Sequence, residues 1–220
     1  RLDVTFEMDG KEEVATGDLV LVATGRRPIT DALEGAKVEV EMNRRFIAID
    51  DNYRTNIDGL YAIGDCTGKS MLAHSAEEMG LRCAELLAGQ KPRRLDYHKI
   101  PSCLYTSPEA ASVGLTQDQA EEQGYPTVAG VFPLLANSRA LIVGQGKGTF
   151  VKIVADEETK EVLGVHIFGP YATEIIAEAS LALGLECTVN ELAETVHPHP
   201  TVSEGIKEAA ASLLDGAIHF

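Results

Sequence analysis

Two apolar segments decide the fold: Phe150-Val-Lys-Ile-Val-Ala155 and Val162-Leu-Gly-Val-His-Ile-Phe168. Both are rich in β-branched residues and bounded by polar or glycine-containing stretches, which is typical of strands. The sequence around them predicts an α+β arrangement, in which short strands come first and helices follow. The other expected strands lie near 102–105, 112–114 and 128–132. A short helix is expected after a capping box formed by Thr116 and Gln119. Three further helices are expected at about 172–184, 189–195 and 202–214.

The residues before the polar, Pro-containing linker Gln90–Arg94 have a different pattern. Alternation over Arg1–Met8, the turn pair Asp9-Gly10 and a second strand toward Ala15 predict a hairpin. The run Asp18-Leu-Val-Leu-Val-Ala-Thr-Gly25 predicts a strand buried on both faces. Strand-and-turn pattern continues over 46–49 and 59–63, and a helix starts near Met71 and stops at Gly89.

Composition excludes several classes of protein. The 220 residues are 45% hydrophobic and 24% charged, as in a folded domain, and no apolar run approaches the ~20 residues of a membrane span. A net charge of −15 disfavours nucleic-acid binding. The four cysteines form no C-x-x-C or C-x-x-x-x-C pair, so we expect neither a zinc knuckle nor a local redox disulfide. Four scattered thiols without an evident partner indicate a reducing compartment, and we expect a cytoplasmic protein. Because the chain begins with Arg1 inside an expected strand, we expect a fragment of a longer protein.

A first candidate site follows the segment Thr55–Asp65. Asp65 ends a predicted strand next to Gly64, where a carboxylate can accept hydrogen bonds from ligand hydroxyl groups. The alternative is that Asp65 only completes a turn. Soon after it, Met71-Leu-Ala-His74 opens the expected helix, whose free N–H groups favour an anionic ligand atom.

A second candidate site is His197-Pro-His-Pro-Thr-Val-Ser-Glu204. The prolines restrict the backbone around His199, and a carboxylate at Glu204 can orient the imidazole and make it a general base. The alternative is that Glu204 forms a capping box with Thr201, and both roles are compatible because a carboxylate has two oxygens. Two alternating histidines without a further ligand are weak support for a metal, and we predict none.

Around these residues the sequence resembles the pyridine nucleotide–disulfide oxidoreductases, and among them the dihydrolipoamide dehydrogenases, over their C-terminal half. The matching segments are Ala23-Thr-Gly25 with the following Arg-Arg-Pro, Thr55–Asp65, Met71–His74, Ile100–Glu109, Val113–Thr116, Asn137-Ser-Arg-Ala140 and His197–Glu204. Pro198 stands where Ala is common in the family.

The resemblance implies a role for each matched residue. Asp65 would hold a ribityl hydroxyl of FAD, and Met71, Leu72, Ala73 and His74 would place a helix N-terminus near the flavin. Gly25 would allow NAD to approach the backbone. His199, oriented by Glu204, would take a proton from dihydrolipoamide in the active site of the partner subunit, so a homodimer is required.

The resemblance also implies a domain order: residues 1–30 end an NAD-binding domain, 31–95 belong to an FAD-binding domain, and 96–220 form the dimerisation domain. The chain has neither the G-x-G-x-x-G that binds the FAD diphosphate nor the C-x-x-x-x-C of a redox disulfide. We therefore expect an oxidoreductase as the parent protein and an inactive isolated chain. The dithiol would be carried on an acyltransferase or a glycine-cleavage carrier protein. Two alternatives remain open: a glutathione-reductase-like enzyme and a dimerisation module without catalysis.

Overall fold

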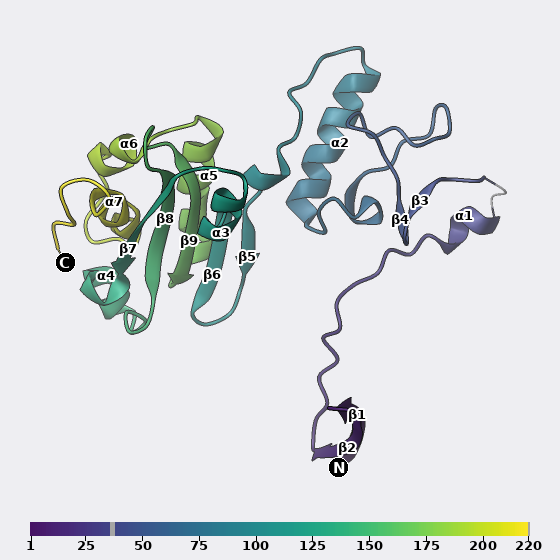
Figure 1. The fold of residues 1–220 in the computed structure, drawn as a ribbon, viewed down its shortest axis with the longest axis horizontal. Helices are drawn as coiled ribbons and strands as arrows, with labels where there is room; N and C mark the ends of the chain where they lie inside the picture. The colour runs from purple at the N-terminus through teal and green to yellow at the C-terminus, as the bar shows by residue number, and fades with distance from the viewer. Residues whose placement is uncertain (36–37, 220) are drawn as a thin grey trace. The chain divides into compact units, whose positions relative to one another are not determined.

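The computed structural model describes residues 1–35 and 38–219 (Figure 1). The chain divides into two units, Arg1–Gly68 and Lys69–Phe220. The boundary after Gly68 separates the helix that starts near Met71 from most of residues 31–95, with which it was expected to form one domain. The predicted domain boundaries stay a prediction.

The first unit begins with an antiparallel hairpin of β1 (Leu2–Met8) and β2 (Lys11–Gly17). Asp9 and Gly10 connect the strands with φ angles of 52° and 74°. Positive φ at both central residues fits the right-handed twist of a hairpin and favours this Asp-Gly pair. The predicted hairpin is confirmed.

The rest of the first unit contains short elements and a small core. They are α1 (Asp31–Gly35), β3 (Met42–Asn43) paired with β4 (Phe46–Ile47), and the 3-10 helix η1 (Gly64–Thr67). Ile47, Tyr53 and Ala62 are buried. The strand pattern predicted over 59–63 reduces to one bridge between Arg54 and Tyr61, because the chain there turns back on itself.

The buried strand predicted over Asp18–Gly25 is wrong. These residues form no strand, and their large apolar side chains are exposed. A strand forms when a neighbouring strand takes up its backbone hydrogen bonds. Among the described residues none pairs with this segment, so its hydrophobicity alone does not fold it.

The second unit is built on a five-stranded antiparallel sheet in the order β5-β6-β9-β8-β7 (Figure 1). The strands are β5 (Ser102–Leu104), β6 (Glu109–Gly114), β7 (Thr127–Pro133), β8 (Phe150–Asp156) and β9 (Val162–Gly169). The apolar segments 150–155 and 162–168 form β8 and β9, which pair with each other near the centre, with Val151 opposite Ile167. The five predicted strands are confirmed, and β6 begins three residues earlier than expected.

Helices cover this sheet and supply much of its core. α5 (Ala172–Gly184) packs against β6 and β9, and α7 (Glu204–Ala211) packs against β7, β8 and α6 (Val189–Glu194). The buried residues of this layer include Phe132, Leu134 and Ile153. The remaining elements are α2 (Ala73–Leu87), the 3-10 helices η2 (Tyr97–Lys99) and η3 (Leu134–Ala136), α3 (Gln117–Glu122) and α4 (Ser138–Ile142).

The predicted helices agree with the structure apart from their ends. α2 is followed by Gly89 at φ 78°, a glycine stop of the expected kind. α3 has the predicted capping box, since the Thr116 hydroxyl accepts from the Gln119 N–H and the Gln119 side chain accepts from the Thr116 N–H. α7 begins two residues after the expected start at 202. No helix among the described residues is long and apolar enough to span a membrane.

Candidate functional site

The second candidate site lies on the loop between α6 and α7. The α6 helix ends at Glu194, and the chain then crosses two prolines before Glu204 opens α7. The peptide bond between His199 and Pro200 is cis. The loop thus places a histidine and the first residue of a helix close together in space.

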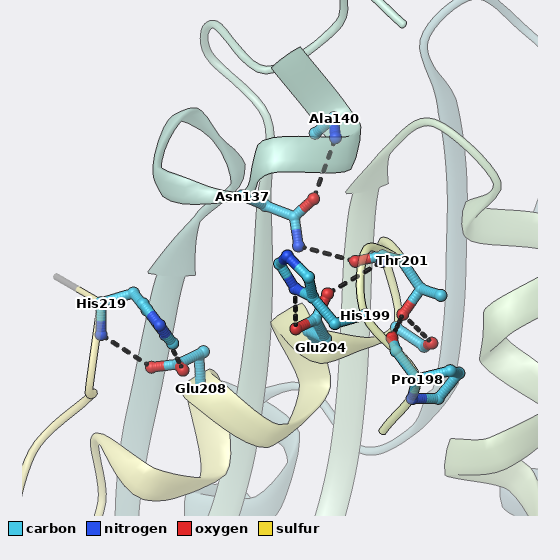
Figure 2. A network of polar contacts seen from close by, with 9 residues as sticks. Asn137, Ala140, Pro198, His199, Thr201, Glu204, Glu208 and His219 are labelled. Atoms are coloured by element: carbon cyan, nitrogen blue, oxygen red, sulfur yellow. Dashed lines mark hydrogen bonds and ion pairs between the residues drawn. The ribbon is translucent and has the colours of Figure 1, made fainter. Parts of the chain in front are cut away.

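The His199 imidazole and the Glu204 carboxylate are in direct contact (Figure 2). Nδ1 of His199 lies 2.9 Å from Oε1 of Glu204, while Oε2 accepts a hydrogen bond of 2.8 Å from the Thr201 backbone N–H. Because a carboxylate accepts, Nδ1 carries the proton and Nε2 of a neutral ring is left with its lone pair. No hydrogen bond to Nε2 of His199 occurs among the described residues, and the side chain is 71% exposed. The ring can therefore take up a proton from a molecule in solution.

The expected capping box is only half formed. Glu204 accepts from the Thr201 N–H, but the Thr201 hydroxyl donates to the Pro198 carbonyl and contacts the Ser203 hydroxyl instead of a helix N–H. Burial raises the pKa of Glu204, and the hydrogen bonds from Thr201 and His199 outweigh this, so that the pKa is lowered overall. The carboxylate therefore stays ionised and can stabilise a protonated imidazole.

A buried asparagine supports the loop from the other side (Figure 2). The Asn137 amide donates to the Thr201 carbonyl at 2.9 Å, and its side-chain oxygen accepts from the Ala140 N–H at 2.9 Å, which caps α4. The resemblance includes Asn137–Ala140 but implies no role for this block. The contact joins residues 64 positions apart, so only the matched motif could have indicated it.

A second histidine–carboxylate pair borders the first. Glu208, one turn after Glu204 on α7, is 4% exposed and lies 2.7 Å from Nδ1 of His219. It also accepts from the Ile218 N–H at 2.7 Å and, as Figure 2 shows, from the His219 N–H, which ties the C-terminal segment to the helix. A cavity of about 100 Å³ lies between the two pairs. Its lining residues are Phe132, Ala136, Asn137, Ser138, His199, Glu204, Glu208 and His219.

The residues of the first candidate site are distributed over both units. Asp65 belongs to the first unit, on η1, where its half-exposed carboxylate lies 3.7 Å from the Arg26 guanidinium. Gly25, in the same unit, has φ 92°, and a Cβ added there would meet no atom within 4 Å. Both positions are therefore open to a ligand.

The segment Met71–His74 belongs to the second unit, and α2 starts at its third residue. Leu72 is the N-cap, and its apolar side chain makes no capping hydrogen bond to the first N–H groups of α2. Nε2 of His74 lies 2.8 Å from the Pro101 carbonyl, which holds that ring against the start of the sheet domain. An uncapped helix start favours an acceptor atom from elsewhere.

Among the described residues no group of three His, Cys, Asp or Glu side chains is arranged to hold a metal ion. The four cysteines are free thiols. Burial raises the pKa of the Cys66, Cys83 and Cys103 thiols, so these thiols are poor nucleophiles.

Comparison with known proteins gives consistent results. Among curated proteins, the chain is 44% identical to the mitochondrial dihydrolipoyl dehydrogenase of Pisum sativum and 41% identical to the dihydrolipoyl dehydrogenase of Bacillus subtilis. These matches cover 100% of this chain but 44% and 46% of the two relatives. Among solved structures, LpdA from Mycobacterium tuberculosis matches with a TM-score of 0.84 at 31% identity, over 94% of this chain and 44% of that one. The chain thus spans less than half the length of these proteins.

Two family models also match. Residues 2–80 match the pyridine nucleotide-disulphide oxidoreductase model, and residues 100–210 match the dimerisation domain of the same family. The second match covers the whole sheet of the second unit and the loop that carries His199. The resemblance found in the sequence is confirmed, and the chain belongs to the pyridine nucleotide-disulphide oxidoreductases.

Proposed function

We propose that the chain supplies the general base and the dimerisation domain of a dihydrolipoamide dehydrogenase, an enzyme that oxidises dihydrolipoamide with NAD through FAD and a redox disulfide. The observation that carries the proposal is the exposed His199 ring held by Glu204 at 2.9 Å. The names of the relatives from Pisum sativum and Bacillus subtilis support the substrate class.

In this proposal His199 removes a proton from one thiol of the dithiol. Nε2 accepts the proton, and Oε1 of Glu204 holds the Nδ1 proton and stabilises the resulting imidazolium. The thiolate is the nucleophilic form of the dithiol, so deprotonation prepares it to attack a disulfide. Thr201, bonded to the other carboxylate oxygen, keeps Glu204 in place during the transfer.

The base would serve the active site of the partner subunit in a dimer of the longer protein. The 220 residues contain no C-x-x-x-x-C pair, so the redox disulfide would come from a part of that protein outside them. The dimerisation-domain match supports a homodimer as the arrangement that brings the two groups together. The dithiol would reach the site on the lipoyl group of an acyltransferase or of a glycine-cleavage carrier protein. Free cysteines are compatible with a reducing compartment such as the cytoplasm, which is part of the proposal.

Three features of the chain fit the binding of FAD and NAD. Asp65 would accept a hydrogen bond from the ribityl chain of FAD, and the uncapped start of α2 would stabilise negative charge on the flavin. The open backbone at Gly25 would admit NAD. FAD, when bound, would carry electrons from the dithiol to NAD. If Asp65 only completes a turn, Asp65→Ala will leave the flavin content of the holoenzyme unchanged; the proposal predicts a loss.

The proposal is tested in a chimera that joins the unmatched part of the Bacillus subtilis enzyme to these 220 residues. We expect NAD reduction by dihydrolipoamide, and His199→Gln should lower it by about 10²–10⁴-fold. Electron transfer from NADH to an artificial acceptor needs no such base and should persist. His98→Gln, an exposed histidine of η2, is the matched control.

Other outcomes would contradict the proposal. Unchanged dihydrolipoamide turnover in His199→Gln would remove His199 as the base. Turnover of glutathione disulfide in place of dihydrolipoamide would favour the glutathione-reductase-like alternative. A dimeric chimera that binds no flavin and turns over neither substrate would favour a dimerisation module without catalysis.

A further inference from the structure

His197 differs from His199 in every contact, although the two are two residues apart. The His197 side chain is 4% exposed, and Nε2 lies 2.7 Å from Oε1 of Glu178 on α5. Its Nδ1 lies 3.0 Å from the Thr195 carbonyl oxygen. Both ring nitrogens are therefore engaged within the protein, and the ring is closed to solvent.

The contacts of His197 decide its protonation state. A carbonyl oxygen only accepts, so Nδ1 must donate to Thr195. The proton between Nε2 and Glu178 belongs on the imidazole, because the ordinary pKa of histidine exceeds that of a glutamic acid by about two units. The hydrogen bond to Glu178 raises the pKa of His197 more than burial and the positive charge of Lys207 lower it. The ring is thus an imidazolium that donates at both nitrogens.

The charged ring connects the catalytic loop to the helical layer. Glu178 lies on α5, which packs against β6 and β9, so the loop is tied to a helix that is fixed on the sheet. Pro198 then fixes the backbone between the anchored histidine and His199. After His199, the Thr201 N–H bond to Glu204 fixes the loop at the start of α7. The free ring is held from both sides.

We propose that His197 is a positioning residue: a buried imidazolium, paired with Glu178, that sets the direction of the His199 ring toward Glu204. This inference rests on the proposed function, in which His199 is the base. The two histidines of the motif thus have opposite roles, since one keeps its protons and the other exchanges them.

The test uses ¹⁵N NMR of the histidine rings in the 220-residue chain. At neutral pH both nitrogens of His197 should have the shifts of protonated imidazolium nitrogens, and the neutral His199 ring should carry its proton on Nδ1. His197→Gln removes the charge, and Glu178→Gln removes its partner with little change of size. In both variants the preference of His199 for the Nδ1-protonated form should be lost. His98→Gln should leave the His199 signals unchanged.

Any of the following three results would overturn the proposal. A singly protonated His197 would refute the charge assignment. Unchanged His199 signals in either variant, with native circular dichroism, would show that the pair does not orient the ring. Unfolding of both variants would mean that the pair acts on the fold and not on His199. None of these measurements depends on turnover, so failure of the proposed function, measured in the chimera, is separately visible.

Discussion

Two apolar segments of similar composition have opposite environments in the two units. In the first unit, Leu19 and Leu21 are 91% and 90% exposed, whereas Val151 and Ile153 in the second unit are fully buried. The second pair lies on β8, which has a hydrogen-bonded strand on each side and α7 packed on it. The first pair has no neighbouring strand among the described residues. Hydrophobicity specifies burial only where partner elements are present.

The largest expected difference in stability is between truncating a leucine to alanine in the second unit and in the first. Leu134→Ala removes a fully buried side chain that packs in the helix-covered core, and it should lower the free energy of unfolding by about 2–5 kcal/mol. Leu21→Ala should change it by less than about 0.5 kcal/mol. Urea unfolding followed by circular dichroism measures both. Similar losses at the two sites would break the comparison, because Leu21 would then have to be packed.

Replacing a glycine with alanine in each unit should give a smaller difference in the free energy of unfolding. At Gly164 on β9 an added Cβ would lie 2.1 Å from the Leu115 carbonyl oxygen, so the neighbouring chain would have to move. We expect Gly164→Ala to cost about 1–3 kcal/mol. At Gly25 the added Cβ meets nothing within 4 Å, and only the φ of 92° causes strain. The same urea experiment should therefore show a smaller loss for Gly25→Ala, and a larger one would contradict the open environment of Gly25.

The sequence predicted the second unit better than the first for a physical reason. The strands and the helices after Ala172 are local patterns whose partners lie within the same 220 residues. The run Asp18–Gly25 has an equally clear pattern and no strand beside it among the described residues. The short helix α4 was missed because its 5 residues are too few to show a helical apolar period, although its N-cap, Asn137, is a residue type that favours a helix start.

The two histidine–glutamate contacts of the candidate site also differ in how well the sequence predicted them. The contact between His199 and Glu204 was predictable because the two residues are five positions apart and one opens a helix. The contact between His197 and Glu178 spans 19 positions and depends on how α5 packs, so the spacing gave no indication of it. The catalytic and cofactor roles of these residues stay predictions that the proposed experiments test.

A third contrast concerns the two carboxylates of the candidate sites. Glu204→Ala leaves the Thr201 N–H and the His199 ring without their acceptor and should cost about 1 kcal/mol, as for the loss of a helix cap. Asp65→Ala removes one exposed ion pair, at 3.7 Å, and should cost less than about 0.5 kcal/mol. Thermal unfolding of the two variants compares the losses. An equal or larger loss for Asp65→Ala would mean that Asp65 has structural contacts beyond Arg26.

The smallest expected effect is a pH dependence that arises in the second unit. All six histidines, His74, His98, His166, His197, His199 and His219, lie in Lys69–Phe220, so histidine titration distinguishes this unit from the first. The hydrogen bond to Glu178 raises the pKa of the anchored His197 ring against the opposing influence of burial and Lys207.

The sign of the effect follows from that raised pKa. A raised folded-state pKa means that the stability from His197 is fully present below the unfolded pKa of about 6.5. It is lost as the pH rises through the folded-state value. His197→Gln should therefore lower the free energy of unfolding more near pH ~6 than near pH ~9, as measured by urea unfolding at both values. Taking the difference between the native chain and the variant cancels the other titrating groups, including His166, whose pKa is lowered first by burial. A loss that is the same at both pH values, or larger at the higher one, would mean that the ring is neutral in the folded protein and that its bond to Glu178 involves no charge.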